Sequence, residues 1–242
     1  MTHRPEPTHV RPMREQDLRQ SAAIHHGELD DSFFARLGPR FLQAYHRTYV
    51  TSPHAVALVV VTGGRVQGFL VGVLAPTAHG AYVLRTWGVR LAVVGGMALL
   101  VRPRELVLFL RTRLGRYARG LWRRRRGAAG TSAPAQGGTN APAQAGISPP
   151  AQPATSAVLS HLAVCRSAQG SGAGAALVAR FAQEVRAASV SSIVLLTAVD
   201  GPGAGFYRRL GYTEQGNVVG GDGQTWLRFR QQLDTDGRSG GA

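Results

Sequence analysis

The apolar and polar positions divide the chain into two structured halves. In the first half, a short strand near Val10 precedes a helical segment. Residues 32–50 carry apolar side chains at helical spacing, interrupted at Gly38-Pro39, which predicts two short helices. Two β-branched runs then flank Gly63-Gly64, which predicts a β-hairpin.

The second half follows a regular order of short elements. "AVLSHLAVC" predicts a strand, "RSAQGSGAG" a loop and "AALVARFAQEVRAAS" a helix with one apolar face. "SIVLLTAV" predicts another strand, "AGFYRRLGY" a short helix closed by Gly211, and "TWLRFRQQL" a last strand. A strand, loop, helix and strand in this order form a βαβ-type unit, so we expect an α/β fold.

Two segments of unusual composition lie between the halves. Residues 82–126 predict a pair of basic amphipathic helices split at Pro103, and residues 127–156, rich in Ala, Pro, Gly and Gln, predict a disordered linker. We therefore expect the folded domain to comprise residues 1–81 and 157–233, with a disordered tail over 234–242.

Charge and cysteine content indicate where the positive charge lies, whether a disulfide can form and where in the cell we expect the protein. The chain has a formal net charge of +15 and all of its 28 basic residues are arginine. Twelve of them lie between Arg85 and Arg126, against one acid, Glu105, so the excess charge belongs to one segment. A single cysteine, Cys165, excludes an internal disulfide. The best candidate for a membrane span, the apolar run Leu91 to Val101, has 11 residues and is too short to cross a bilayer. Because the N-terminus also lacks the apolar core of a signal peptide, we expect a cytoplasmic protein.

The loop "QGSGAG", residues 169–174, is the first candidate for chemistry. Glycines at a helix start let backbone N–H groups approach an anion, and the helix dipole favours negative charge there. A structural turn explains the glycines equally well. The loop lacks the G-x-G-x-x-G pattern of dinucleotide sites, and a chain without lysine has no P-loop.

The residues around this loop favour an anion-binding loop over a purely structural turn. "LAVCRSAQGSGAGAALV" resembles the acetyl-CoA-binding motif of the GNAT acetyltransferase superfamily, and "GFYRRLGY", about thirty residues on, resembles its second signature. "VRPMREQDL" resembles the usual first strand and helix. The resemblance implies the acyl-CoA N-acyltransferase fold, a mixed central sheet flanked by helices, which the basic helical insertion interrupts. It also implies that acetyl-CoA contacts Leu162, Ala163, Val164, Gln169, Gly170, Ser171, Gly172, Ala173, Gly174 and Ala175.

The implied chemistry is acetyl transfer to a primary amine, which needs a proton acceptor for the amine and an acid for the departing thiolate. The resemblance assigns the acid to Tyr207; a packing role against the last strand is the alternative. His161 and Ser160 are candidates for the base, and since adjacent strand residues face opposite sides, we expect at most one to face the reacting groups. Ordered water is the alternative base, and Cys165 lacks an assignable partner for a nucleophilic role.

The resemblance places His25, His26, Asp30 and Asp31 where the first helices meet the acceptor substrate. Their spacing matches no known metal motif, so we expect no metal, and a polar loop is the alternative to a substrate contact. The acceptor amine and the oligomeric state are not readable from the sequence. The alternative function is a catalytically weak or inactive acyl-CoA-binding module that associates with membrane or nucleic acid through its Arg-rich insertion. The shortened loop "DGPGAG" before Tyr207 keeps this alternative open.

The Arg-rich insertion, residues 85–126, allows three interpretations. It could cap the active site, lie on an anionic membrane as a peripheral contact, or bind nucleic acid. The apolar content of residues 87–110 argues against a purely nucleic-acid arm, which would be more polar.

Overall fold

The computed structural model describes residues 8–29, 33–100, 156–220 and 224–233. They form one seven-stranded sheet in the order β1-β2-β3-β4-β5-β7-β6. The strands are β1 (His9–Pro12), β2 (Ala55–Thr62), β3 (Arg65–Val73), β4 (Ser156–Val164), β5 (Ser192–Ala198), β6 (Thr213–Val219) and β7 (Thr225–Gln232). All neighbouring strands are antiparallel except β4 and β5, which are parallel. The mixed α/β architecture is therefore confirmed.

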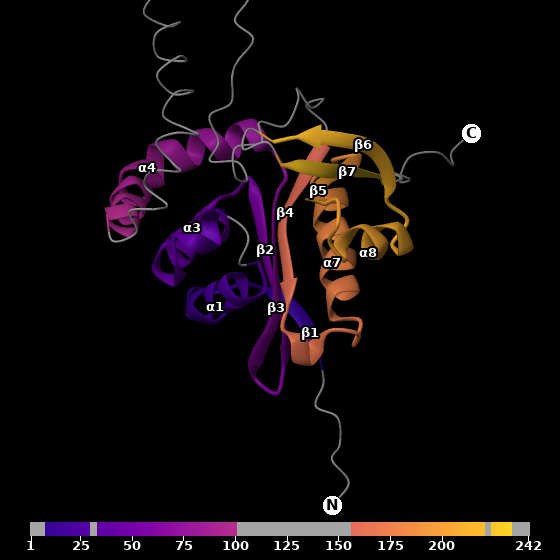
Figure 1. Ribbon diagram of the computed structural model, residues 1–242, viewed down its shortest axis with the longest axis horizontal. Coiled ribbons are helices and arrows are strands. Elements are labelled where there is room, and N and C mark those ends of the chain that lie inside the picture. The colour runs from indigo at the N-terminus through magenta and orange to yellow at the C-terminus, as the bar shows by residue number, and fades with distance from the viewer. Residues whose placement is uncertain (1–7, 30–32, 101–155, 221–223, 234–242) are drawn as a thin grey trace, which may run out of the picture.

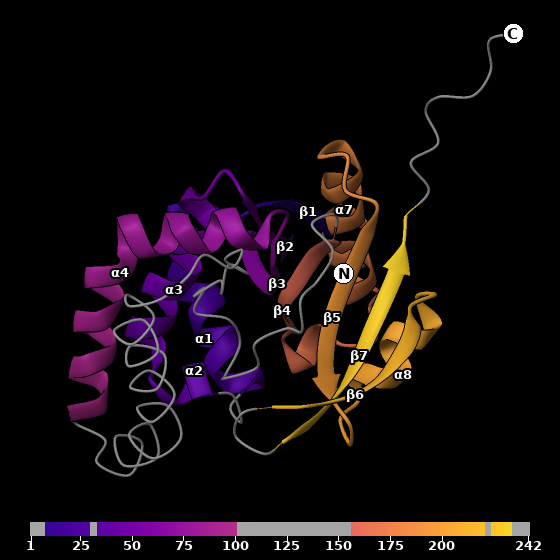
Figure 2. The ribbon, with the colours of Figure 1, turned by 90° about the horizontal axis from the view of Figure 1, so that it is seen from above.

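Helices cover both faces of the sheet (Figures 1 and 2). The helical elements are η1 (Glu15–Asp17), α1 (Leu18–Glu28), α2 (Phe33–Arg36), α3 (Pro39–Thr51), α4 (Pro76–Leu100), η4 (Arg166–Ala168), α7 (Ala173–Ala187) and α8 (Gly203–Arg209). One core cluster lies between the sheet and α1, α2, α3 and α4, and a second lies between the sheet and α7 and α8. The sheet thus separates an α1/α3 side from an α7 side.

The expected hairpin joins β2 and β3, and Gly63 and Gly64 adopt positive φ angles of 59° and 71° at its turn. Gly68 and Gly72 in β3 sit where a neighbour comes close. A Cβ on Gly68 would lie 2.8 Å from the carbonyl oxygen of Ala163, and a Cβ on Gly72 would lie 2.4 Å from the ring of Phe181. Glycine here lets β4 and α7 pack directly on the β3 backbone.

The first helix of the insertion is present and begins earlier than expected. α4 starts at Pro76, where proline suits the first turn of a helix, and runs to Leu100. The expectation that no segment is long and apolar enough to cross a membrane is wrong. By length and composition, α4 passes this test, with a mean hydropathy of 1.4 over 18 residues. The second basic helix and the linker, residues 101–155, lie outside the described residues, as does the 234–242 tail.

Candidate active site

The parallel strands β4 and β5 pair over only a short distance. Their register covers Ser156 to Val158 of β4 and Ser192 to Val194 of β5. Both strands continue beyond that point, β4 to Val164 and β5 to Ala198. Along the remainder of β4, the backbone groups that face β5 pair with no strand in the described part of the chain, whereas those on the other side pair with β3. Leu162, Ala163 and Val164 lie on this stretch, which can offer backbone hydrogen bonds to an extended ligand.

The glycine loop follows β4 directly and leads into α7. Gly170 and Gly172 have positive φ angles of 79° and 84°, and a Cβ built on either would meet nothing within 4 Å. Open space therefore lies over the loop. Gly172 is the N-cap of α7, whose first N–H groups lack acceptors within the helix. The loop and helix start thus form an anion-binding end, which fits the pyrophosphate of coenzyme A.

Three hydrogen bonds, made by Gln169 and Arg166, hold this loop in place. The side-chain amide of Gln169 donates to the carbonyl oxygen of Val164 at 3.0 Å and to Glu28 at 3.4 Å. The backbone N–H of Arg166 also donates to Glu28, at 3.2 Å. Glu28 ends α1 on the opposite side of the sheet, so it links the α1/α3 side to the loop. No sequence pattern pointed to Glu28, because it lies 138 residues from Arg166 along the chain.

The two motifs separated in the sequence meet in space. A Cβ on Gly174, in the first turn of α7, would lie 3.3 Å from the ring of Phe206 in α8. Gly203 at the start of α8 is packed even more closely, since its Cβ would lie 2.3 Å from Oγ1 of Thr197 in β5. The short loop before α8 therefore places that helix against the end of β5 and beside the start of α7.

Tyr207 lies on α8 and is 7% exposed. Its ring contacts Phe206, Tyr212 and Phe229 at centroid distances of 5.1, 5.5 and 6.1 Å. Burial, together with Tyr212, raises the pKa of the Tyr207 phenol well above its ordinary value. The hydroxyl is therefore neutral at physiological pH and can donate a proton or a hydrogen bond, while the ring packs against the last strand.

The expectation that Ser160 and His161 face opposite sides is wrong. Leu159 pairs with Gly72 and His161 pairs with Val71, so Ser160 is an extra residue in β4, a β-bulge. The bulge breaks the alternation of side chains, and both residues reach α3. His161 Nε2 lies 3.1 Å from the hydroxyl of Tyr45, and Ser160 hydrogen-bonds the hydroxyl of Tyr49.

These side chains form one continuous chain of hydrogen bonds, since the hydroxyls of Tyr45 and Tyr49 lie 2.6 Å apart. Tyr45 and Tyr49 were missed in the sequence because their spacing of four residues is that of core positions on any helix. Burial lowers the pKa of His161 to about 4, so its imidazole is neutral at pH 7 and is a weak proton acceptor.

Two further histidines, His25 and His46, lie next to His161. His25 Nδ1 is 2.8 Å from His46 Nε2, and His46 Nδ1 is 3.0 Å from Oγ of Ser21. The rings of His25 and His161 are 4.7 Å apart. The expected polar loop is wrong for His25, which is fully buried in α1, and His26 lies on the same helix with its Nδ1 2.9 Å from the carbonyl of Ala35.

Asp30 and Asp31 lie outside the described residues. Within the described ranges, no group of three His, Cys, Asp or Glu side chains is arranged to hold a metal ion. Cys165 is half-buried, and burial and the nearby Glu28 raise the pKa of its thiol. A protonated thiol is a poor nucleophile, which argues against covalent catalysis by Cys165.

The comparisons with known proteins bear on the same residues. Residues 145–233 match the sequence model of the Acetyltransferase (GNAT) domain, a range that includes β4, the glycine loop, α7 and α8. The chain contains a GNAT acetyltransferase domain. No curated protein matches it.

Solved structures extend this similarity to the fold of the GNAT domain. SsHAT aligns with a TM-score of 0.56 and 19% identity over 93% of this chain and 98% of its own. Ard1 from Thermoplasma volcanium aligns with a TM-score of 0.53 and 14% identity, over 93% and 97%. A variant of SpeG spermidine N-acetyltransferase from Vibrio cholerae aligns with a TM-score of 0.51 and 13% identity, over 93% of each chain. At these identities the GNAT domain shares its fold with them, and the acceptor is not determined.

Proposed function

We propose that the protein transfers an acetyl group from acetyl-CoA to a primary amine. The observation that carries this proposal is the contact of α8, which bears Tyr207, with the start of α7 through Phe206 and Gly174, next to the glycine loop that follows the β4 edge not paired with β5. In this arrangement Gly170 to Ala175 would hold the pyrophosphate through backbone N–H groups. Leu162 to Val164 would hold the pantetheine through backbone groups. Acetyl-CoA would supply the acetyl thioester.

Tyr207 would assist the departing thiolate by donating a hydrogen bond to its sulfur. Its raised pKa keeps the phenol protonated but makes it a weaker acid than a thiol, so the thiolate would take its proton from solvent. His161 is poorly suited to take the proton from the amine, because a pKa near 4 gives little driving force against an ammonium group. We therefore propose that water takes the proton from the amine. His161 would instead hold the hydroxyl of Tyr45 in place through their hydrogen bond.

The test compares Tyr207→Phe with Tyr82→Phe. Tyr82 lies on α4 and its hydroxyl donates to the carbonyl of Thr51, so it controls for the loss of a tyrosine hydroxyl elsewhere. The full chain is given acetyl-CoA and a panel of primary amines, and release of free thiol is measured. We expect Tyr207→Phe to lower kcat by about a hundredfold with acetyl-CoA affinity within about twofold, and Tyr82→Phe to leave both unchanged.

Tight binding of acetyl-CoA with no turnover on any amine would favour the binding module instead. Unchanged kcat in Tyr207→Phe would remove Tyr207 from the proposal. No binding of acetyl-CoA by the folded chain would contradict the proposed function as a whole.

A further inference from the structure

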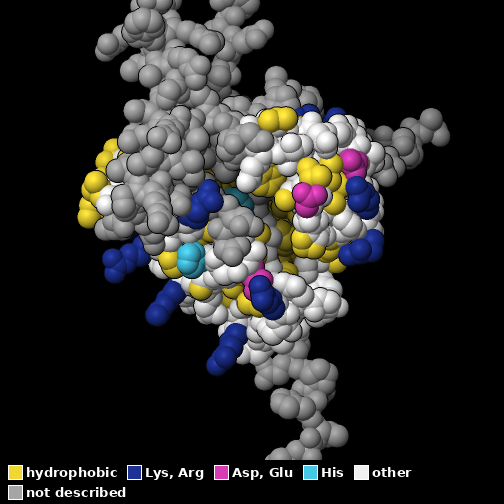
Figure 3. Space-filling view, viewed as in Figure 1, with side chains coloured by type: hydrophobic (Ala, Val, Ile, Leu, Met, Phe, Trp, Pro, Cys, Tyr) yellow, Lys and Arg dark blue, Asp and Glu magenta, His cyan; other side chains and the backbone are white. Residues whose placement is uncertain are grey.

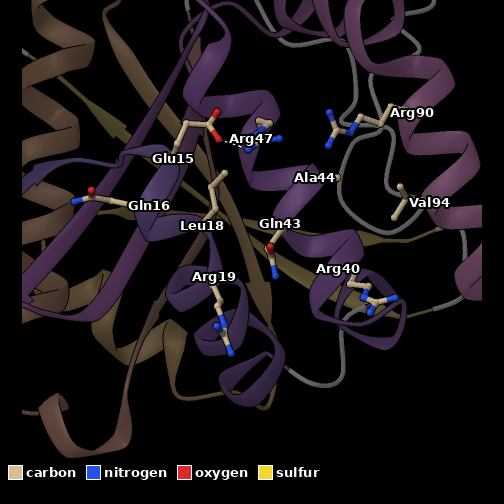
Figure 4. A pocket seen from close by; sticks show the side chains of 10 residues that line it. All are labelled: Glu15, Gln16, Leu18, Arg19, Arg40, Gln43, Ala44, Arg47, Arg90 and Val94. Carbon is tan, nitrogen blue, oxygen red and sulfur yellow. Dashed lines mark hydrogen bonds and ion pairs between the residues drawn. The ribbon is translucent and has the colours of Figure 1, made fainter.

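A pocket of about 300 Å³ lies on the α1/α3 side, away from the glycine loop. It opens between η1 and the start of α1, the outer surface of α3, and the middle of α4 (Figure 4). Its lining includes one carboxylate, that of Glu15, and four arginines from three helices, namely Arg19, Arg40, Arg47 and Arg90.

The charges of this pocket are not balanced by its own residues. Glu15 pairs with Arg47, while Nε of Arg47 is buried without a hydrogen-bond partner in the described part of the chain. Among the described residues, Arg19 and Arg40 make no ion pair, and Arg90 contacts only the ring of Trp87, at 5.4 Å. Three guanidinium groups are therefore available, which favours an anion with several oxygens, such as a phosphate.

An apolar surface lies beside the pocket on α4. Val89, Val93, Met97 and Leu100 are all exposed, from 58% at Val93 to 82% at Val89. Val93 and Met97 follow Arg90 by three and seven residues, so they lie on the same side of the helix as this pocket arginine. Figure 3 shows hydrophobic side chains gathered over α4 at the left edge, with arginine side chains below them.

The side of α4 that turns toward α3 holds the helix on the domain. Leu91, Val94 and Ala98 pack against the α1/α3 core cluster, and a Cβ on Gly95 would lie 3.3 Å from the ring of Phe41. The indole N–H of Trp87 donates to Oγ1 of Thr51 at 3.2 Å. A helix docked in this way can present its outer face to a surface without leaving the domain, so lying on a membrane suits it better than crossing one.

We propose that the pocket binds the phosphate of an anionic membrane lipid while the outer face of α4 lies against the bilayer. The pocket and the exposed apolar side chains of α4 would each contact a different part of the lipid. The pocket arginines match a phosphate headgroup, and the exposed apolar stripe matches the hydrocarbon boundary. A soluble phosphate would use only the pocket and would leave the stripe in water.

The test uses flotation of the full chain with vesicles of phosphatidylcholine alone and of phosphatidylcholine mixed with phosphatidylglycerol. The pocket variant is Arg19→Gln with Arg40→Gln. Its control is Arg65→Gln with Arg186→Gln, which removes the same charge from exposed positions outside the pocket. The control is needed because ten further arginines between residues 102 and 126 can attract an anionic surface without any pocket.

A second pair of variants tests the apolar stripe. Val93→Ser with Met97→Ser is compared with Val219→Ser, which removes an exposed valine from β6, far from α4 in the sheet order. We expect binding to the mixed vesicles to weaken about tenfold in the pocket variant and severalfold in the stripe variant, and less than twofold in both controls. Acetyl-CoA affinity, measured on the same proteins, should not change, which separates this proposal from the proposed function.

Three results would overturn the proposal. The first is equal vesicle binding by the pocket variant and its arginine control, which would assign the attraction to general charge. The second is no loss in the stripe variant. The third is binding of inorganic phosphate, lost in the pocket variant, by a protein that binds neither kind of vesicle, which would identify a site for a soluble anion.

Discussion

Two buried tyrosines offer a matched test of the hydrogen-bond chain around His161. Tyr45→Phe and Tyr212→Phe remove the same atom from side chains that are 2% and 4% exposed. The Tyr45 hydroxyl has two partners, Tyr49 at 2.6 Å and His161 at 3.1 Å. The Tyr212 hydroxyl is buried with no partner in the described part of the chain.

The expected changes in the free energy of unfolding differ between the two variants in direction as well as in size. A net hydrogen bond contributes about 1 kcal/mol, so Tyr45→Phe should lower the free energy of unfolding by about 2 kcal/mol, and by more if Tyr49 and His161 find no new partner. Removing the unpaired hydroxyl of Tyr212 relieves a desolvation penalty, so Tyr212→Phe should leave stability unchanged or raise it by up to about 1 kcal/mol.

Urea unfolding followed by circular dichroism measures the difference. With an m value of about 2 kcal/mol/M, the two variants should differ in midpoint by at least about 1 M, with Tyr45→Phe the lower. Equal midpoints would refute the reasoning, because the hydrogen-bonded chain would then contribute no more than an isolated buried hydroxyl.

Two further predictions concern packing and pH. Gly72→Ala should lower the free energy of unfolding by about 2 kcal/mol, because its Cβ would lie 2.4 Å from the fully buried ring of Phe181. Gly96→Ala, on the open face of α4, should raise the free energy of unfolding by up to about 1 kcal/mol, and thermal unfolding measures both variants. Burial lowers the pKa of His46 to about 3 and of His161 to about 4, so the unfolded chain takes up more protons below about pH 6.5. Stability should fall as the pH drops from about 6.5 toward 4, and urea midpoints that stay constant over that range would contradict the buried, neutral state of both rings.

The sequence predicted those elements that depend only on residues close together along the chain. The double glycine at Gly63-Gly64 predicted the hairpin because a tight turn needs positive φ angles, and the chain supplies them there. The glycine loop and "GFYRRLGY" were found as separate motifs. Their contact through Gly174 and Phe206 could not be read from the sequence, since it depends on how α7 and α8 pack.

The features that were missed depend on contacts between distant residues. β6 has no apolar alternation because nearly all of Thr213–Val219 is exposed, and it forms only by pairing with β7. The bulge at Ser160 arises from the register between β3 and β4. His25 looked polar in sequence but lies in the core, where His46 satisfies its Nδ1.

The central claim, that the glycine loop holds acetyl-CoA, is tested most directly by calorimetric titration of Gly172→Glu beside Gly64→Glu. Both glycines have positive φ angles and open space around the missing Cβ, but Gly64 lies in the β2–β3 turn. The account predicts that the wild type and Gly64→Glu bind acetyl-CoA alike, while Gly172→Glu binds at least roughly tenfold more weakly, because its carboxylate would meet the pyrophosphate. Equal affinity in all three proteins would contradict it.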